Sequence, residues 1–130
     1  MNPKGITIRS CECSVKEIMN RLVVFLQQNG ATIYVRINQQ MELNQAGLDL
    51  GPLEFLMFSN PKSNGAVMIE NPVTALDLPS KIIAWEDQEK KRWIAYNDAA
   101  YLKERYSLPN DITSSLELHD LISKALDKTS

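Results

Sequence analysis

The side chains best placed for chemistry follow a dense apolar run, Leu53–Phe58. Asn60 offers a hydrogen-bond donor and an acceptor, and Lys62 offers a positive charge. Pro61 between them removes a backbone donor and biases Asn60 toward extended geometry, so a buried strand ends here. Polar side chains at the end of a buried strand, with a long return segment after them, commonly line a pocket. We therefore expect a pocket for a small organic or anionic ligand at Asn60 and Lys62.

The candidate walls of this pocket come from later in the chain and are Lys81, Trp93, Tyr96 and Asn97. Aromatic rings would supply an apolar platform, and the lysine and asparagine would supply polar groups. Each candidate has a structural alternative. An asparagine before proline often serves a turn, both lysines would serve as solvated surface charges, and the two aromatic residues would serve as core or dimer contacts.

The two cysteines are the other reactive side chains. Cys11 and Cys13, on or near a strand, direct both thiols to one face, which suits a chelate or a redox pair. Zinc would need two further ligands, and the one histidine, His119, lies far along the chain in a predicted helix. We therefore expect two free thiols, no metal and no cofactor.

Motifs for catalysis are absent from the sequence: it has no nucleophile-elbow motif, no metal-spaced cluster and no phosphate-binding glycine loop. This favours a binding module over an enzyme. The alternative is a cofactor-independent enzyme in which Lys62 or a Cys11/Cys13 thiolate acts as nucleophile or base.

Composition sets the broad class of the protein. A chain of 130 residues, 44% hydrophobic and 23% charged, is typical of one globular domain, residues 1–130. The net charge of −2 argues against nucleic-acid binding, which usually leaves a basic surface. No apolar stretch approaches the roughly 20 residues that a membrane span needs, and the first residues do not form a signal peptide. We expect a cytoplasmic protein with no membrane or nucleic-acid partner.

Alternation and capping signals predict the elements that position these residues. Strands are expected at residues 5–10, 31–37, 53–58, 81–86 and 92–96. A capping box at Ser14 and Glu17 begins a helix that Gly30 ends, and short helices follow Asn38 and Asp98. A second capping box at Ser114 and Glu117 begins a closing helix, on which His119 lies away from the apolar stripe. Between the central strand and the next one, a polar turn is expected at Asn64 and Gly65, and Asp77 is expected as a turn or cap residue.

The last two strands are apolar on both faces, since Ile82 and Ala84 alternate with Ile83 and Trp85. A two-layer domain covers one face of its sheet and leaves the other toward water. A second apolar face therefore calls for a lid, a ligand or another subunit. We expect a homodimer with Trp85, Trp93 or Tyr96 near the centre of its interface.

Several motifs together resemble domain-of-unknown-function family 302. They are Phe58–Lys62, Asn71-Pro72, Ala75–Lys81, Trp85–Asp87 and Trp93–Asp98, with the capped first helix and Ala46–Leu48 in addition, so nearly the whole chain is covered. The resemblance implies an α+β fold of the TATA-binding-protein-like class, β-α-β4-α, in which two helices back an antiparallel sheet. It also implies a homodimer without an agreed activity, and it does not imply DNA binding, because fold does not fix function.

The chain departs from the family pattern at two positions. Ser59 stands where family members generally have glycine, so the turn before Asn60 is expected to be less tight. Asn38 stands where many members have histidine, so any proton chemistry of that histidine is missing from this protein.

Overall fold

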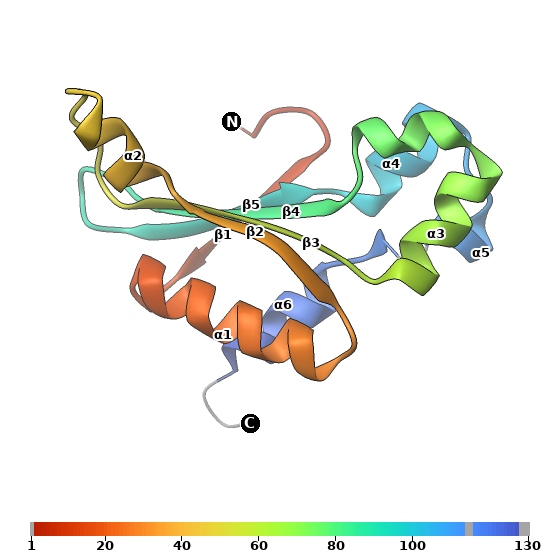
Figure 1. Ribbon diagram of the computed structural model, residues 1–130, viewed down its shortest axis with the longest axis horizontal. Coiled ribbons are helices and arrows are strands. Elements are labelled where there is room, and N and C mark those ends of the chain that lie inside the picture. Colours follow the sequence, from red (N-terminus) through yellow and green to blue (C-terminus); the bar gives the residue numbers. More distant parts are fainter. Residues whose placement is uncertain (1, 114–115, 128–130) are drawn as a thin grey trace.

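The computed structural model describes residues 2–113 and 116–127, apart from the side chains of residues 61–63 and 112–113. Its centre is a five-stranded antiparallel sheet with the order β1-β5-β4-β3-β2 (Figure 1). The strands are β1 (Ile6–Cys11), β2 (Thr32–Asn38), β3 (Leu53–Ser59), β4 (Ser80–Glu86) and β5 (Arg92–Asn97). Each strand lies within one residue of its predicted bounds, because alternating apolar residues specify both the strand and its buried face.

Two helices, α1 (Val15–Gln28) and α6 (His119–Leu126), cover one face of the sheet (Figure 1). The predicted cap of α1 is present, because the Ser14 hydroxyl accepts a hydrogen bond of 3.1 Å from the backbone N–H of Glu17. Past its other end, Gly30 has a φ of +84°, a left-handed conformation that favours glycine. The predicted α+β class, with two helices behind an antiparallel sheet, is therefore confirmed.

The main core lies between these helices and the sheet. Leu56 of β3, Ile82 of β4 and Ile94 of β5 are at most 1% exposed. Burying each such side chain contributes about 1.5–3 kcal/mol of transfer free energy. The helices contribute the other fully buried side chains of this core, which are Ile18, Met19, Leu22, Leu26 and Ile122.

The long return segment after β3 differs from the prediction. A helix, α3 (Pro61–Glu70), replaces the polar turn expected at Asn64 and Gly65. Proline is well suited to the first position of a helix, because the first backbone N–H groups have no partner within the helix. Pro61 therefore ends the strand, as expected, and also begins a helix.

The remaining helices lie in the connections between strands. They are α2 (Gln39–Gln45), the 3-10 helix η1 (Pro72–Leu76), α4 (Ala99–Tyr106) and α5 (Asn110–Thr113). The Asn38 side chain caps α2 as predicted, accepting 3.0 Å from the backbone N–H of Met41. Asp98 precedes α4 but makes no side-chain cap bond; its carboxylate accepts from the Thr7 hydroxyl of β1 instead.

The closing helix begins later than the sequence suggested. The expected cap, Ser114, lies outside the described residues, and α6 starts at His119 without a side-chain cap. The apolar stripe is as predicted, since Leu118 and Ile122 are buried in the main core with Leu121, Ala125 and Leu126 packed against them.

A second apolar cluster holds α3 against α4 at one end of the sheet. Val67 of α3 is fully buried there, together with Leu102 of α4 and Leu78 before β4. Asp77 ties the 3-10 helix to α4 by accepting hydrogen bonds from Arg105, at 3.1 Å, and from the Tyr106 hydroxyl. These contacts hold α3 against α4 and against the residues that precede β4.

No helix of the described chain crosses the middle of the other sheet face: α2 lies at one end, and α3, α4 and α5 lie at the other (Figure 1). We call this surface the open face. Lys81 is the one charged strand residue that the register places on it. Its large apolar residues are half-buried or exposed; they are Ile6, Ile8, Val35, Ile37, Leu53, Phe55, Met57, Ile83, Trp85 and Trp93.

Candidate functional site

A cavity of about 190 Å³ lies where β3 ends and α3 begins. Asn60 lines it from the connection after β3, Asn64 lines it from the first turns of α3, and Ser80 lines it from the start of β4. The two helices behind the sheet complete its walls. The other lining residues are Leu26, Asn29, Ala31, Phe58, Glu117, Leu118 and Leu121.

Asn60 therefore lies at a concavity after the central strand, where the sequence placed it. Its backbone carbonyl accepts a helical hydrogen bond of 2.9 Å from the N–H of Asn64, so the two asparagines lie one helical turn apart, with Asn60 just before α3 and Asn64 within it. Lys62 is the third residue after the end of β3, but its side chain lies outside the described part, and its expected place beside Asn60 remains a prediction.

Asn64 carries a buried hydrogen-bond donor that has no partner among the described residues. The residue is 3% exposed, and its side-chain Nδ2 makes no hydrogen bond within the described residues. Leaving a buried donor unpaired costs about 1–3 kcal/mol, and native proteins keep few such groups. An enclosed, unpaired donor of this kind is a local cost to the stability of the fold.

The polar groups at the cavity's edge have protein partners. One carboxylate oxygen of Glu117 accepts a 2.9 Å hydrogen bond from the backbone N–H of His119, and the Asn29 amide donates 2.8 Å to the carbonyl of Phe25. Glu117 is exposed and is the one formally charged residue among the ten described residues that line the cavity. The cavity thus has apolar walls, with asparagine side chains among its lining residues and a carboxylate at its edge.

Lys81 and Asn97 do not line this cavity. They meet at a neighbouring cleft of about 10 Å³, which also includes Ser80 and Leu118. That volume holds about one water molecule. These two predicted walls therefore lie near the site but face a space too small for an organic ligand.

Trp93 lies far from the cavity. It pairs with Trp85 near the opposite end of β4, and its indole N–H donates 2.9 Å to Asp87 in the β4–β5 loop. This hydrogen bond lowers the pKa of the Asp87 carboxyl, and the backbone N–H groups of Glu89 and Lys91 also bond to it. The ring of Trp93 thus helps to order the hairpin loop.

Tyr96 points into the helix layer, not toward the cavity or the open face. It is 5% exposed, belongs to the main core, and its hydroxyl lies 3.1 Å from Nδ1 of His119. His119 is exposed, as predicted from its position off the apolar stripe, but it has this partner. Tyr96 is accordingly unavailable as an anchor on the open face.

Both cysteines are free, with Cys13 buried and Cys11 half-buried. Burial and the neighbouring Cys11 thiol raise the pKa of Cys13, so its thiolate is disfavoured. Over residues 2–113 and 116–127, no group of three or more His, Cys, Asp and Glu side chains is arranged to hold a metal ion. Nor does any described helix combine the length and apolar character required to cross a membrane.

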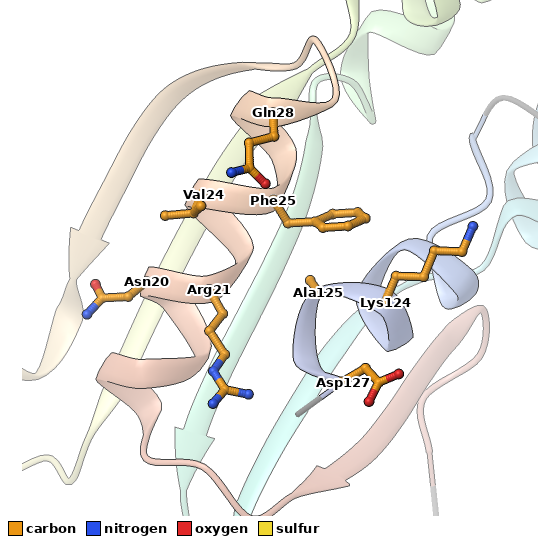
Figure 2. Close-up of a pocket in the computed structure, with 8 residues that line it drawn as sticks. All are labelled: Asn20, Arg21, Val24, Phe25, Gln28, Lys124, Ala125 and Asp127. Atoms are coloured by element: carbon orange, nitrogen blue, oxygen red, sulfur yellow. The ribbon is translucent and has the colours of Figure 1, made fainter. Parts of the chain in front are cut away.

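A more open hollow of about 620 Å³ lies between α1 and α6. Figure 2 shows Phe25 pointing from α1 toward α6, where Ala125 lies, while Lys124 points away from α1. Arg21 on its edge is already bonded to Glu17 at 2.9 Å and to the carbonyl of Leu126 at 3.3 Å. Because no buried polar side chain in this hollow lacks a partner among the described residues, it is a weaker candidate site.

The sequence did not single out Asn64 or Glu117 as site residues. The Asn64-Gly65 pair looked like a turn, and Glu117 looked like half of a capping box. Had Pro61 been taken as the first residue of a helix, the four-residue spacing of Asn60 and Asn64 would have placed both on one face.

Comparisons with known proteins place the chain in a family. A family model described as "Domain of unknown function DUF302" matches residues 6–129. A crystal structure of an uncharacterized conserved protein DUF302 from Bacillus stearothermophilus superimposes with a TM-score of 0.80, at 21% identity, over 96% of this chain and 98% of that one. This likeness shows a shared fold.

Longer proteins contain a similar segment. A protein named "Fluoride-specific ion channel FluC 1" from Brucella suis biovar 1 (strain 1330) is 35% identical over 104 residues, which are 80% of this chain and 41% of that protein. A protein named "Fluoride-specific ion channel FluC 2" from Brucella melitensis biotype 1 matches at 35% over 104 residues, 38% of its length. The chain thus spans about two fifths of the curated relatives that it matches.

Proposed function

Because this chain belongs to the DUF302 family, whose description assigns no activity, we propose from its own geometry that it is a binding module for a small organic molecule. The ligand occupies the cavity between Asn60 and Asn64. The observation that carries this proposal is the cavity at the end of β3, which Asn60, Asn64 and Ser80 line with polar side chains.

The size and lining of the cavity support the same function. Its volume of about 190 Å³ is below that of a drug-sized pocket, about 300–1,000 Å³, so the ligand is small. Apolar walls from Leu26, Phe58 and Leu121 provide burial, and a few polar groups provide orientation. The cavity lies between rigid elements, since β3, β4, α1 and α3 all contribute residues.

A thermal-shift screen of small compounds on three forms of the protein tests this function. Compounds that stabilise the wild type should stabilise Asn60→Ala less, by the equivalent of about 2- to 10-fold in affinity if one hydrogen bond is lost. Asn38→Ala, which removes the cap of α2, is the matched control: it should unfold earlier yet keep the full ligand-induced shift.

A variant that fills the cavity separates a site from a scaffold. Ala31→Leu places a larger side chain in the cavity wall and should abolish the shift. Equal shifts in the wild type, Asn60→Ala and Ala31→Leu would show that the compounds bind elsewhere and would end the proposal.

The working unit of this module is a homodimer that packs the open face of one copy against that of another. Figure 1 shows this face without a helix over its middle. Five strands of about six residues span roughly 20 Å by 20 Å. The projected area, about 400 Å², is close to the roughly 500 Å² per partner that the smallest specific interfaces bury. Met41 and Leu48, on and after α2, are apolar side chains that are 57% and 59% exposed, and α2 lies at one end of this face.

A second copy suits the open face because that face is nearly uncharged. Trp85 and Trp93 pair across β4 and β5 and supply the aromatic anchors typical of interface centres. An apolar sheet face can pair with its own copy around a two-fold axis without opposing like charges. In the proposed dimer, Trp85 and Trp93 lie in the interface, whereas Tyr96 stays in the main core.

The enzyme alternative has less support. A nucleophilic thiolate needs a lowered pKa, whereas burial raises the pKa of Cys13. The fluoride-channel names belong to proteins of which this chain matches about two fifths, so we propose a shared domain and not a shared transport activity. The two free thiols favour a reducing compartment, in keeping with the expected cytoplasmic location.

A further inference from the structure

We propose that Cys11 and Cys13 are a redox-sensitive dithiol that closes to a disulfide when the protein meets an oxidant of the disulfide class, such as glutathione disulfide. The proposal goes beyond ligand binding, because the two cysteines lie at the opposite end of the sheet from the cavity. Cys11 pairs with Arg92, which pairs with Glu86 at the end of β4, whereas the cavity residue Ser80 begins β4.

The backbone brings the two cysteines close together on one side of the sheet. Cys11 is the last residue of β1, and Cys13 lies in the bend that leads to α1. Cys13 belongs to the main core and Cys11 packs against it, so both side chains lie on the helix side. Residues two apart have Cα atoms at most about 7 Å from each other, and a bend shortens that distance. A disulfide spans about 4.4–6.8 Å between Cα atoms, so this pair is within its range.

The two thiols are also in contact. A hydrogen bond between the Cys11 and Cys13 side chains is one of the causes, after burial, that raise the pKa of Cys13. The bend that holds them is fixed from the neighbouring strand, since Nη1 of Arg92 donates 3.3 Å to the backbone carbonyl of Glu12. Arg92 is itself held by Glu86 at 2.8 Å. The dithiol therefore lies on an ordered part of the backbone.

The difference in exposure sets the order of the reaction. Cys11 is half-buried, whereas Cys13 is 5% exposed and its thiolate is disfavoured. The Cys11 thiol therefore loses its proton to water first, and its thiolate attacks one sulfur of glutathione disulfide. This step forms a mixed disulfide and expels one glutathione thiolate. Cys13 then loses its proton, and its thiolate attacks the Cys11 sulfur and expels the second glutathione thiolate.

The reaction is balanced and reversible. Two electrons pass from the protein to glutathione, so two protein thiols become one disulfide and one glutathione disulfide becomes two thiols. The second step is intramolecular, because Cys13 lies two residues from the mixed disulfide, and it outcompetes a second glutathione molecule. A disulfide across so short a loop is strained in comparison with a long-range one, so a dithiol reductant reopens it.

Intact-mass spectrometry of the folded wild type tests the proposal. The reduced protein is freed of reductant, treated with millimolar glutathione disulfide, and quenched with acid. We expect a monomer whose mass is lower by about 2 Da and that has no thiol left for alkylation after denaturation. Dithiothreitol should restore both thiols. The chain has two cysteines in all, so the assignment of the bond is unambiguous.

Two single variants separate the steps. Cys13→Ala should stop at the mixed disulfide, with one glutathione on Cys11. Cys11→Ala should react at least about tenfold more slowly, because its remaining thiol is buried. The wild-type measurement decides the proposal even if a variant fails to fold. Both thiols still free at equilibrium, a mixed disulfide that persists in the wild type, or a disulfide between two copies would each overturn it.

Discussion

Replacing Asn64 by leucine should make the protein more stable while removing its ligand. The two side chains have similar size, and the substitution eliminates a buried Nδ2 that has no partner within the described residues. Removing that unpaired group should recover about 1–3 kcal/mol. Leucine also has a higher helix propensity than asparagine, and this adds up to about 0.5 kcal/mol in α3. We therefore expect the free energy of unfolding to rise by about 1–3 kcal/mol.

Urea unfolding followed by circular dichroism measures this change, and a calorimetric scan should show a midpoint raised by at least about 3 °C. Asn20→Leu in α1 is the control. It has the same propensity gain but loses a 2.7 Å hydrogen bond from Arg36, so it should not stabilise. A loss of about 1 kcal/mol or more in Asn64→Leu would show that Nδ2 is hydrogen-bonded within the folded chain, and the account of Asn64 as an unpaired residue would be wrong.

The remaining predictions concern the dimer, the backbone and the thiols. Ile83→Lys on the open face should give a monomer by light scattering, whereas Val24→Lys, at a site 53% exposed on α1, should leave a dimer; a monomeric wild type would contradict the interface. Gly5→Ala should lower the free energy of unfolding by at least about 2 kcal/mol, because φ at Gly5 is +79° and a Cβ there would lie 2.3 Å from the ring of Tyr101. Gly30→Ala is the control: φ is +84° but nothing described lies within 4 Å of the added Cβ, so the loss should be about 1–2 kcal/mol. Equal losses in the two variants would refute the contact between Gly5 and Tyr101. Because the pKa of Cys13 is raised in the folded state, its contribution to stability should be present below the unfolded-state pKa and decline as the pH rises above it. Cys13→Ala should reduce the fall in the free energy of unfolding with pH. An equal fall in the wild type and the variant would contradict the raised pKa of Cys13.

The strands and the two long helices were predictable because local rules and tertiary packing agree. Leu56 and Phe58 alternate with Phe55 and Met57 on β3, and the sheet buries the first pair under α1 and α6. The Ser14 cap needed only a local hydrogen bond, which forms as expected. The strand order was not predictable, because β1 pairs with β5 from the far part of the chain.

The site was predictable in position but not in composition. The end of β3 at Asn60 follows from Pro61, a local effect. Helix α3 depends on Val67, whose burial against Leu102 and Leu78 stabilises a helix in spite of Gly65. Asn64 became a cavity residue only through that long-range contact, which the sequence pattern does not contain.

A crystal structure of the protein soaked with a compound selected by the thermal-shift screen tests the central claim most directly. The account predicts the compound in the cavity between β3 and α3, in contact with Asn60 and Asn64. A compound bound on the open face or between α1 and α6, with the cavity beside Asn60 left without a ligand at saturating concentration, would contradict it.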